Sequence, residues 1–278
     1  MSRKTQFKSC GGGSPPTRQL EMRPREHMHH PSKPPQGRHR LRLVGLALAL
    51  ALGGASAARA GDSSLEFWPE ADLWFRMNPD WRLSALIPVT KYYESKNRDL
   101  NFYVQGDYAF GTKRGVYLRL VDENRVAQMK VWLVRGGAMT GRSIGEDSGN
   151  YSEDMLYGEL HYRAPLRGGF VFSSRARLDT RWLGDDAEYS YRYRYRAMLE
   201  REVARGSRSY VPYVSVEPFW DSRYSDVTRT RVIGGATLSL NQRFAYEVNL
   251  TYQHDKTYDT TNLYALNVIL HVFFEAKR

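Results

Sequence analysis

Cysteine is nearly absent from this chain, and its absence excludes whole classes of site. Cys10 is the only cysteine among 278 residues. Disulfide frameworks and thiolate metal sites are therefore excluded from everything downstream of it. Four of the seven histidines lie before residue 40, and His161, His254 and His271 are too widely separated to have metal-ligand spacing. We expect no metal centre and no cofactor.

A long hydrophobic run is also missing. The apolar stretch Leu43–Leu52 is shorter than the roughly 20 residues that a transmembrane helix needs, and no later segment comes closer. Three arginines between positions 38 and 42 precede this stretch, and Ala58-Arg59-Ala60 places small residues at the positions that a signal peptidase reads. The arrangement predicts a secretory signal peptide over residues 38–60, and a membrane anchor is the alternative that the short run disfavours.

The signal peptide divides the chain into three predicted parts. Residues 1–37 are rich in proline, glycine, histidine and charge, which is typical of a disordered extension or of a start codon assigned too far upstream. Residues 38–60 are the predicted signal peptide, and residues 61–278 form one predicted domain. The whole protein therefore enters the secretory route in this interpretation.

An excess of one sign of charge is missing from the predicted mature chain. The full sequence has 41 Lys+Arg against 30 Asp+Glu, but residues 1–60 hold 11 of the basic and only 2 of the acidic residues. The remaining 30 and 28 charges nearly cancel. Since no recognition motif is present either, we expect no nucleic-acid partner.

What the sequence does have is a strict alternation of aromatic or apolar residues with charged or polar ones. From Tyr189 to Arg196 tyrosines occupy the odd positions, and arginines occupy the even positions from 192 onward. On a β-strand, successive side chains point to opposite faces, so one face is aromatic and the other is cationic. This alternation, repeated behind a secretion signal, is typical of strands with lipid on one side and a polar interior on the other.

Strand-like segments follow one another along residues 61–278. They indicate an all-β fold, namely a transmembrane antiparallel up-and-down β-barrel of about twelve strands, with ten as the alternative. An even count suits a bacterial barrel whose two termini face the periplasm. The expected strands are 65–76, 81–90, 100–110, 115–122, 128–136, 154–164, 170–182, 188–203, 209–220, 228–240, 243–254 and 262–274.

Loop lengths alternate in the second half. Short connections at 166–169, 204–208 and 241–243 are expected at the periplasmic end, and longer ones at 137–153, 183–187, 221–227 and 255–261 at the outer end. The short segment Asn78–Asp80 does not fit, because the twelve-strand count places it at the outer end. An interfacial aromatic girdle near the strand ends is expected from Trp74, Trp81, Tyr92, Tyr93, Trp182, Trp220 and Tyr224.

A soluble periplasmic β-sandwich or lipocalin-like barrel is the competing interpretation, because its strands also alternate. The long strands and the rows of arginine opposite the apolar face favour the membrane barrel. We therefore expect a bacterial outer-membrane location. Outer-membrane lipid and lipopolysaccharide, and the barrel-assembly machinery during biogenesis, are the expected partners.

One segment resembles a known family. Residues 211–224, V-P-Y-V-S-V-E-P-F-W-D-S-R-Y, are similar to a hallmark of the domain-of-unknown-function 2490 family. The likeness extends to Glu159 within E-L-H-Y-R, to Arg175-Ala176-Arg177, to Arg194-Tyr195-Arg196, and to Arg231 followed by Gly234-Gly235, and it covers about residues 65–274. The resemblance implies an outer-membrane β-barrel of Gram-negative bacteria, and it implies no established activity.

The inward face collects charge. From residue 154 onward this face carries nine arginines and five carboxylates and no lysine, which suits a crowded interior because a guanidinium can bridge two acceptors. A salt-bridge network that braces a narrow barrel and a porin-like cationic lumen that passes small anionic solutes both remain open. The candidate lumen residues are Glu159, Arg175, Arg177, Arg192, Arg194, Arg196, Glu217, Arg229, Arg231 and Glu247.

An outer-membrane hydrolase is the alternative function. Such an enzyme needs an activated water or nucleophile beside a histidine or paired carboxylates. His254-Asp255 and Asp185-Asp186 fall at the predicted outer ends of strands. Asp is ordinary in turns, however, and adjacent strand residues point apart. We therefore assign no catalytic residue.

Overall fold

The computed structural model describes residues 63–92, 98–113, 129–144, 151–184, 186–205, 208–257 and 262–276. All of these residues belong to one compact unit, Leu46–Arg278. The predicted extension 1–37, the predicted signal peptide 38–60 and the predicted strand 115–122 lie outside them. Among the described residues, no helix is long and apolar enough to cross a membrane.

The described part of the chain is built from β-strands. All strands except one are 12 to 16 residues long, and a single 3-10 turn, η2 (Arg167–Gly169), joins two of them. The strands are β1 (Ser63–Arg76), β2 (Trp81–Tyr92), β3 (Arg98–Lys113), β4 (Met129–Ile144), β5 (Ser152–Pro165), β6 (Phe170–Leu183), β7 (Glu188–Arg201), β8 (Val203–Arg205), β9 (Arg208–Asp221), β10 (Asp226–Ser239), β11 (Phe244–Asp255) and β12 (Asn262–Glu275).

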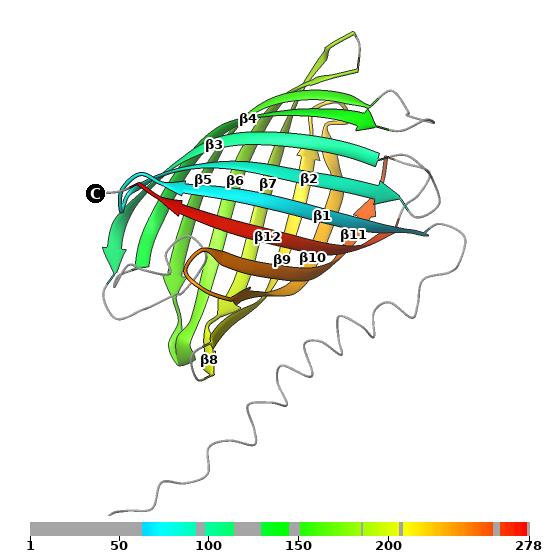
Figure 1. Ribbon diagram of the computed structural model, residues 1–278. Helices are drawn as coiled ribbons and strands as arrows, with labels where there is room; N and C mark the ends of the chain where they lie inside the picture. Colours follow the sequence, from blue (N-terminus) through cyan, green and yellow to red (C-terminus); the bar gives the residue numbers. More distant parts are fainter. Residues whose placement is uncertain are drawn as a thin grey trace, which may run out of the picture. The chain divides into compact units, whose positions relative to one another are not determined.

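These strands close into a barrel of eleven long strands, shown in Figure 1. The three-residue β8 follows β7 and pairs with β9. Long strands that are consecutive in sequence pair antiparallel, as expected, but β1 and β12 close the ring in parallel, from Ser63 opposite Asn262 to Arg76 opposite Glu275. The predicted all-β barrel is confirmed, and the strand count falls between the two expected even numbers.

The odd count follows from the direct pairing of β3 with β4. Their register runs from Arg98 opposite Ile144 to Lys113 opposite Met129, so no strand separates them. Most of the predicted loop 137–153 is therefore wrong, because residues 129–144 form one strand. Gly137 and Gly141 lie in the segment expected as a loop, but their missing side chains make room inside the barrel: a Cβ on Gly137 would lie 2.6 Å from the Tyr157 ring, and one on Gly141 would lie 2.8 Å from the Tyr151 hydroxyl.

The odd count also places the two ends of the barrel chain apart. β1 starts at one end, which we call the Ser63 end, and β12 finishes at the other, which we call the Arg76 end. The expectation that both termini lie at one end is wrong. The short turn 77–80 then lies at the Arg76 end, together with the short connections 166–169, 206–207 and 240–243. The short segment Asn78–Asp80 therefore no longer contradicts the expected placement of short turns at one end.

The wall has an apolar outside and a polar inside, the reverse of a water-soluble barrel. Large apolar side chains are exposed on every long strand, among them Leu83, Val104, Leu160, Tyr193 and Val248. The residues between them are buried and polar, among them Ser84, Gln105, Asp179, Ser190 and Asn249. The Tyr189–Arg196 alternation follows this rule, with the tyrosines outside and the arginines inside.

Aromatic side chains gather at both ends of the outer wall. At the Arg76 end, the ring centroids of Trp81 and Tyr108 lie 4.8 Å apart, and those of Trp132 and Tyr162 lie 4.6 Å apart. At the Ser63 end, Trp182 packs near Tyr189, and Trp220 packs near Tyr191 and Tyr193. Of the predicted girdle, Trp74 is wrong, because its side chain is buried inside the barrel beside His271. Tyr93 and the side chain of Tyr92 lie outside the described part.

Candidate functional site

The charged interior is the candidate site, and one feature organises it. A row of directly opposed residues crosses ten strands, from the Arg76 end of β1 to the Ser63 end of β11. We call it the charged row: Arg76, Arg82, Asp107, Arg135, Glu159, Arg177, Arg194, Phe219, Arg229 and Asp255. Side chains of opposed residues on one face lie within contact distance, so opposite charges on neighbouring strands form ion pairs from Arg82 to Arg177 and again between Arg229 and Asp255.

Ion pairs link the first half of this row. Asp107 accepts hydrogen bonds from Arg82 and from Arg135, whose Nε lies 2.6 Å from Asp107 Oδ1. Arg135 also reaches Glu159 at 3.2 Å, and Glu159 in turn accepts a hydrogen bond of 2.8 Å from Arg177. His161 Nε2 lies 2.7 Å from Glu159 as well. Five strands, β2 to β6, are thus joined by alternating charges.

Two carboxylates outside that first half connect the arginines of β6 and β7. Asp179 pairs with Arg177 and, at 2.8 Å, with Arg192. Glu217 on β9 pairs with Arg175 and accepts a 2.9 Å hydrogen bond from Arg194 Nε. Each carboxylate therefore serves more than one guanidinium, the geometry for which arginine is suited.

Phe219 is the one apolar member of the row, and guanidinium groups surround it. Its ring is almost fully buried. The guanidinium carbons of Arg194, Arg231, Arg192 and Arg229 lie 4.4, 5.0, 5.6 and 5.8 Å from the ring centroid. Cations over an aromatic face are attracted by its quadrupole, so this ring offsets part of the repulsion among the four arginines.

Acidic side chains line β1 and its neighbours. Glu66 and Asp72 are buried on the inner face of β1. Asp72 lies 3.1 Å from His271 Nδ1 on β12, and the other ring nitrogen of His271 lies 3.6 Å from Glu247 on β11. The arginine excess expected from the second half of the chain is therefore offset by these acidic residues and by Asp221 and Asp255, which are buried at the ends of β9 and β11. The whole interior is not strongly cationic.

The carboxylates of the interior are shielded from water. The side chains of Glu159 and Asp179 are 0% exposed, and those of Asp107 and Glu217 are 2% exposed. The guanidinium groups that bind them cover them, and these arginine side chains are themselves only 7–13% exposed.

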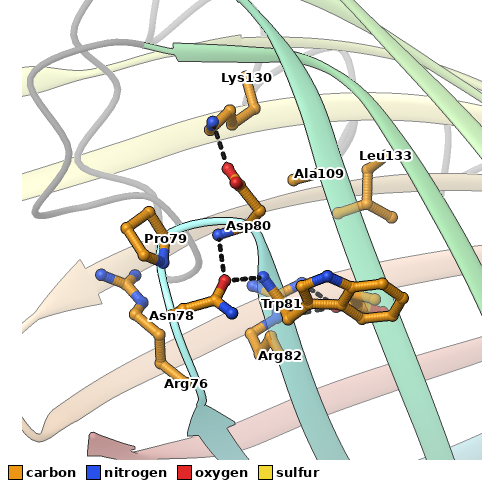
Figure 2. A pocket seen from close by; sticks show the side chains of 10 residues that line it. Arg76, Asn78, Pro79, Asp80, Trp81, Arg82, Ala109, Lys130 and Leu133 are labelled. Atoms are coloured by element: carbon orange, nitrogen blue, oxygen red, sulfur yellow. Dashed lines mark hydrogen bonds and ion pairs between the residues drawn. The ribbon is translucent and has the colours of Figure 1, made fainter.

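A small polar pocket adjoins the Arg76 end of the row, shown in Figure 2. Its volume is about 20 Å³, which is room for about one water molecule. Lys130 Nζ pairs with Asp80 across it, and Asn78 Oδ1 accepts hydrogen bonds from the backbone N–H groups of Asp80 and Trp81. The short turn between β1 and β2 is thus fixed against Arg82 and Asp107, which also line the pocket.

A second ion-pair group lies at the Ser63 end. Arg181 pairs with Glu153 at 2.6 Å and with Asp221 at 3.0 Å. Tyr151, which precedes β5, donates hydrogen bonds to Asn101 and Glu153. Burial and the nearby Glu153 carboxylate raise the pKa of the Tyr151 phenol, so it remains a donor.

All ten predicted lumen residues have inward side chains. Nine of them contact the networks above or their immediate neighbours, including Arg231, which donates to Gln253 at 2.6 Å, and Glu247, which accepts a hydrogen bond from Tyr213. For Arg196, the described residues provide no hydrogen bond or ion pair. Sequence reasoning missed Arg82, Asp107, Arg135, Phe219 and His271, although each has the inward parity of its predicted strand.

The predicted outer-rim histidine site is not assembled. His254 is exposed on the outer wall, whereas Asp255 points inward and pairs with Arg229 at 2.6 Å. Asp186 is exposed in the connection between β6 and β7, and Asp185 lies outside the described residues. Within the described ranges, no three His, Cys, Asp or Glu side chains are placed to hold a metal ion.

An all-β barrel with an apolar wall and an interior of buried, paired charges is the class that this fold and site define. The family described as a protein of unknown function (DUF2490) matches residues 65–264, and the chain belongs to this family. The match runs from β1 to β12 and contains the whole charged row. No curated protein and no solved structure matches the chain.

Proposed function

We propose that this protein is a bacterial outer-membrane β-barrel that spans the membrane with its interior closed and braced by the charged row. The apolar outer wall between two aromatic belts supports the membrane location, because lipid is the solvent that such a wall needs. The predicted signal peptide is consistent with export. The short turns of the Arg76 end would face the periplasm.

The burial of the carboxylates inside the barrel is the main support for a closed interior. Four carboxylates at mid-barrel are at most 2% exposed, and each pairs with at least two guanidinium groups. A general porin needs a water-filled lumen instead. In this proposal the barrel is a structural or binding element of the membrane and does not leak solutes at rest.

Passage of small anions is the second candidate. Its support comes from two arginines. Arg196 forms no ion pair with a carboxylate among the described residues, and Arg231 donates a hydrogen bond to the neutral Gln253. An opened network would present these guanidinium groups to a permeating anion. Reversal potentials in a salt gradient would then show anion preference, and cation preference would remove this candidate.

Fractionation tests the membrane location directly. We expect the protein in the outer-membrane fraction, in contact with lipopolysaccharide and after delivery by the barrel-assembly machinery, and we expect its gel mobility to change on boiling. Recovery in the soluble periplasmic fraction without a mobility change would contradict the proposal. The same preparation supplies folded protein for a hydrolase screen, in which we expect no turnover.

A further inference from the structure

Two pairs of opposed arginines lie side by side on β6 and β7, and the two pairs differ in their carboxylate partners. Arg177 stands directly opposite Arg194, and Arg175 stands directly opposite Arg196. Like charges directly opposite each other destabilise a sheet. Asp179 bridges the first pair, since it binds Arg177 and lies 3.9 Å from Arg194. The second pair lies beside Glu217, which pairs with Arg175 but forms no hydrogen bond or ion pair with Arg196.

The second pair is left with unused donors. Arg175 uses its terminal nitrogens on Glu217 and Glu159, but its Nε is buried without a hydrogen-bond partner. Arg196 has no ion pair or hydrogen bond within the described residues. Buried donors in folded proteins are normally satisfied, so these two point to an acceptor that the described residues do not provide.

Two further groups face the same region from β9 and β10. Ser215 is 4% exposed, and its Oγ has no hydrogen-bond partner. Ser215 precedes Glu217 by two residues on the inner face of β9, and Arg231 stands directly opposite Glu217 on β10. Arg231 donates only to the neutral Gln253 among its hydrogen-bond partners, with its guanidinium over the Trp68 and Phe219 rings.

Charge at this place is also unbalanced. Arg175, Arg194, Arg196 and Arg231 surround Glu217, and Glu217 Oε1 already serves Arg175 and Arg194. Of the other buried carboxylates, Glu159 pairs with Arg175 at 3.5 Å and Asp179 lies 3.9 Å from Arg194. Arg196 and Arg231 are left without an ion pair to a carboxylate among the described residues, and a further anion would compensate them.

We propose that Arg175, Arg196, Arg231 and Ser215 bind an oxyanion of phosphate size inside the barrel. Guanidinium forks match the oxygens of phosphate, and a serine hydroxyl donates a further hydrogen bond. The oxyanion bridges Arg175 and Arg196 as Asp179 bridges the neighbouring pair. This site goes beyond the proposed function, because either a closed barrel or a conducting one can hold it.

Calorimetry on the folded barrel in uncharged, phosphorus-free detergent tests the site, with inorganic phosphate as the probe. We expect saturable binding to the wild type and an affinity at least about tenfold lower in Arg196→Gln and in Arg231→Gln. Ser215→Ala, which changes little volume, weakens binding less. The control Arg142→Gln lies on the outer wall in an exposed ion pair and leaves binding unchanged.

A thermal unfolding measurement separates a ligand role from a packing role. Phosphate raises the unfolding temperature of the wild type by mass action, and we expect this shift to be lost in Arg196→Gln. Without phosphate, Arg196→Gln is expected to unfold no earlier than the wild type, because a like-charge repulsion is removed. A second series with a water-soluble short-chain phosphatidic acid shows whether a lipid phosphate competes for the site.

Two results would overturn the oxyanion site. One is the lack of saturable phosphate binding by the wild type at millimolar concentrations. The other is binding that persists unchanged in both Arg196→Gln and Arg231→Gln. Neither result bears on membrane location or on conductance, so the proposed function is judged separately.

Discussion

At the scale of single residues, Asp179 shows how much the interior depends on paired charge. Its fully buried carboxylate lies among Arg177, Arg192 and Arg194. Asp154 on β5 is a matched contrast, because it pairs with Arg142 while both side chains are about half exposed, at 52% and 50%. The two aspartates differ in burial and in the number of arginines they serve.

The substitutions Asp179→Asn and Asp154→Asn should therefore have different effects. Removing the buried charge leaves three guanidinium groups without it, and we expect the free energy of unfolding to fall by about 3–5 kcal/mol. Removing the exposed charge costs about 0–1 kcal/mol. Urea unfolding of both variants in lipid vesicles measures the difference, and equal losses would show that water reaches Asp179.

Two adjacent glycines of β4 provide a second residue-scale test. A Cβ on Gly137 would meet the Tyr157 ring at 2.6 Å and the Val104 carbonyl oxygen at 2.7 Å, whereas a Cβ on Gly136 would meet nothing within 4 Å. We expect Gly137→Ala to lower the free energy of unfolding by about 1–3 kcal/mol. Gly136→Ala should be neutral or slightly stabilising. The reverse order would mean that the faces of β4 are assigned wrongly.

At the scale of strands, the parallel pairing of β1 with β12 is the least expected feature. Leu65 stands opposite Tyr264, and Phe75 stands opposite Phe274. An antiparallel closure would instead bring Leu65 toward Phe274. Strand direction at the closure can therefore be read from which pairs of positions form a disulfide.

With Cys10 replaced by serine, the double variant Leu65→Cys/Tyr264→Cys should form a disulfide on mild oxidation. The swapped variant Leu65→Cys/Phe274→Cys should stay reduced, because its two positions lie toward opposite ends of the barrel. Mobility on non-reducing gels distinguishes the two. Cross-linking of the swapped pair would require an even strand count.

The strands could largely be predicted from the sequence, whereas the way in which they pair to close the barrel could not. Ten of the twelve expected segments appear as strands with small shifts at their ends, and an eleventh, 128–136, extends to Ile144, because alternation fixes which residues face lipid or interior. The pairing of β3 with β4 joins strands that are separated by residues 114–128, and the continuation of β4 through Gly137 depends on the close approach of Tyr157 from β5. No local pattern reveals either feature. The inward arginines were predictable in the same way, but their carboxylate partners on neighbouring strands depend on register.

At the scale of the whole molecule, the orientation of apolar and polar surfaces decides the environment. Val248 in β11 and Leu240 in the turn after β10 are similarly exposed, at 49% and 46%. In water the two positions would tolerate charge equally. In a membrane barrel Val248 faces hydrocarbon, whereas Leu240 lies in a turn at the barrel end.

Arginine substitutions at these two positions test the membrane assignment. We expect Val248→Arg to destabilise the barrel in lipid bilayers by about 2–4 kcal/mol, and Leu240→Arg by about 0–1 kcal/mol. Folding yield and unfolding in vesicles measure both. Equal, small effects would favour a barrel that is soluble in water.

A count of the inward arginines alone overstates the positive charge of the interior, because carboxylates elsewhere in the barrel balance it. The arginines lie mainly on β6, β7 and β10, and β1 and β3 contribute acidic residues such as Glu66, Asp72 and Asp107. Local surplus and overall balance coexist, so the interior can be closed and still hold a place for an anion.

Single-channel recording in planar bilayers tests the closed interior most directly. We expect wild-type protein, inserted in known amount, to give no steady conductance above background under conditions in which a general porin conducts. In this proposal the paired side chains of the interior block a continuous water path. A steady open current from the wild-type barrel would contradict this account.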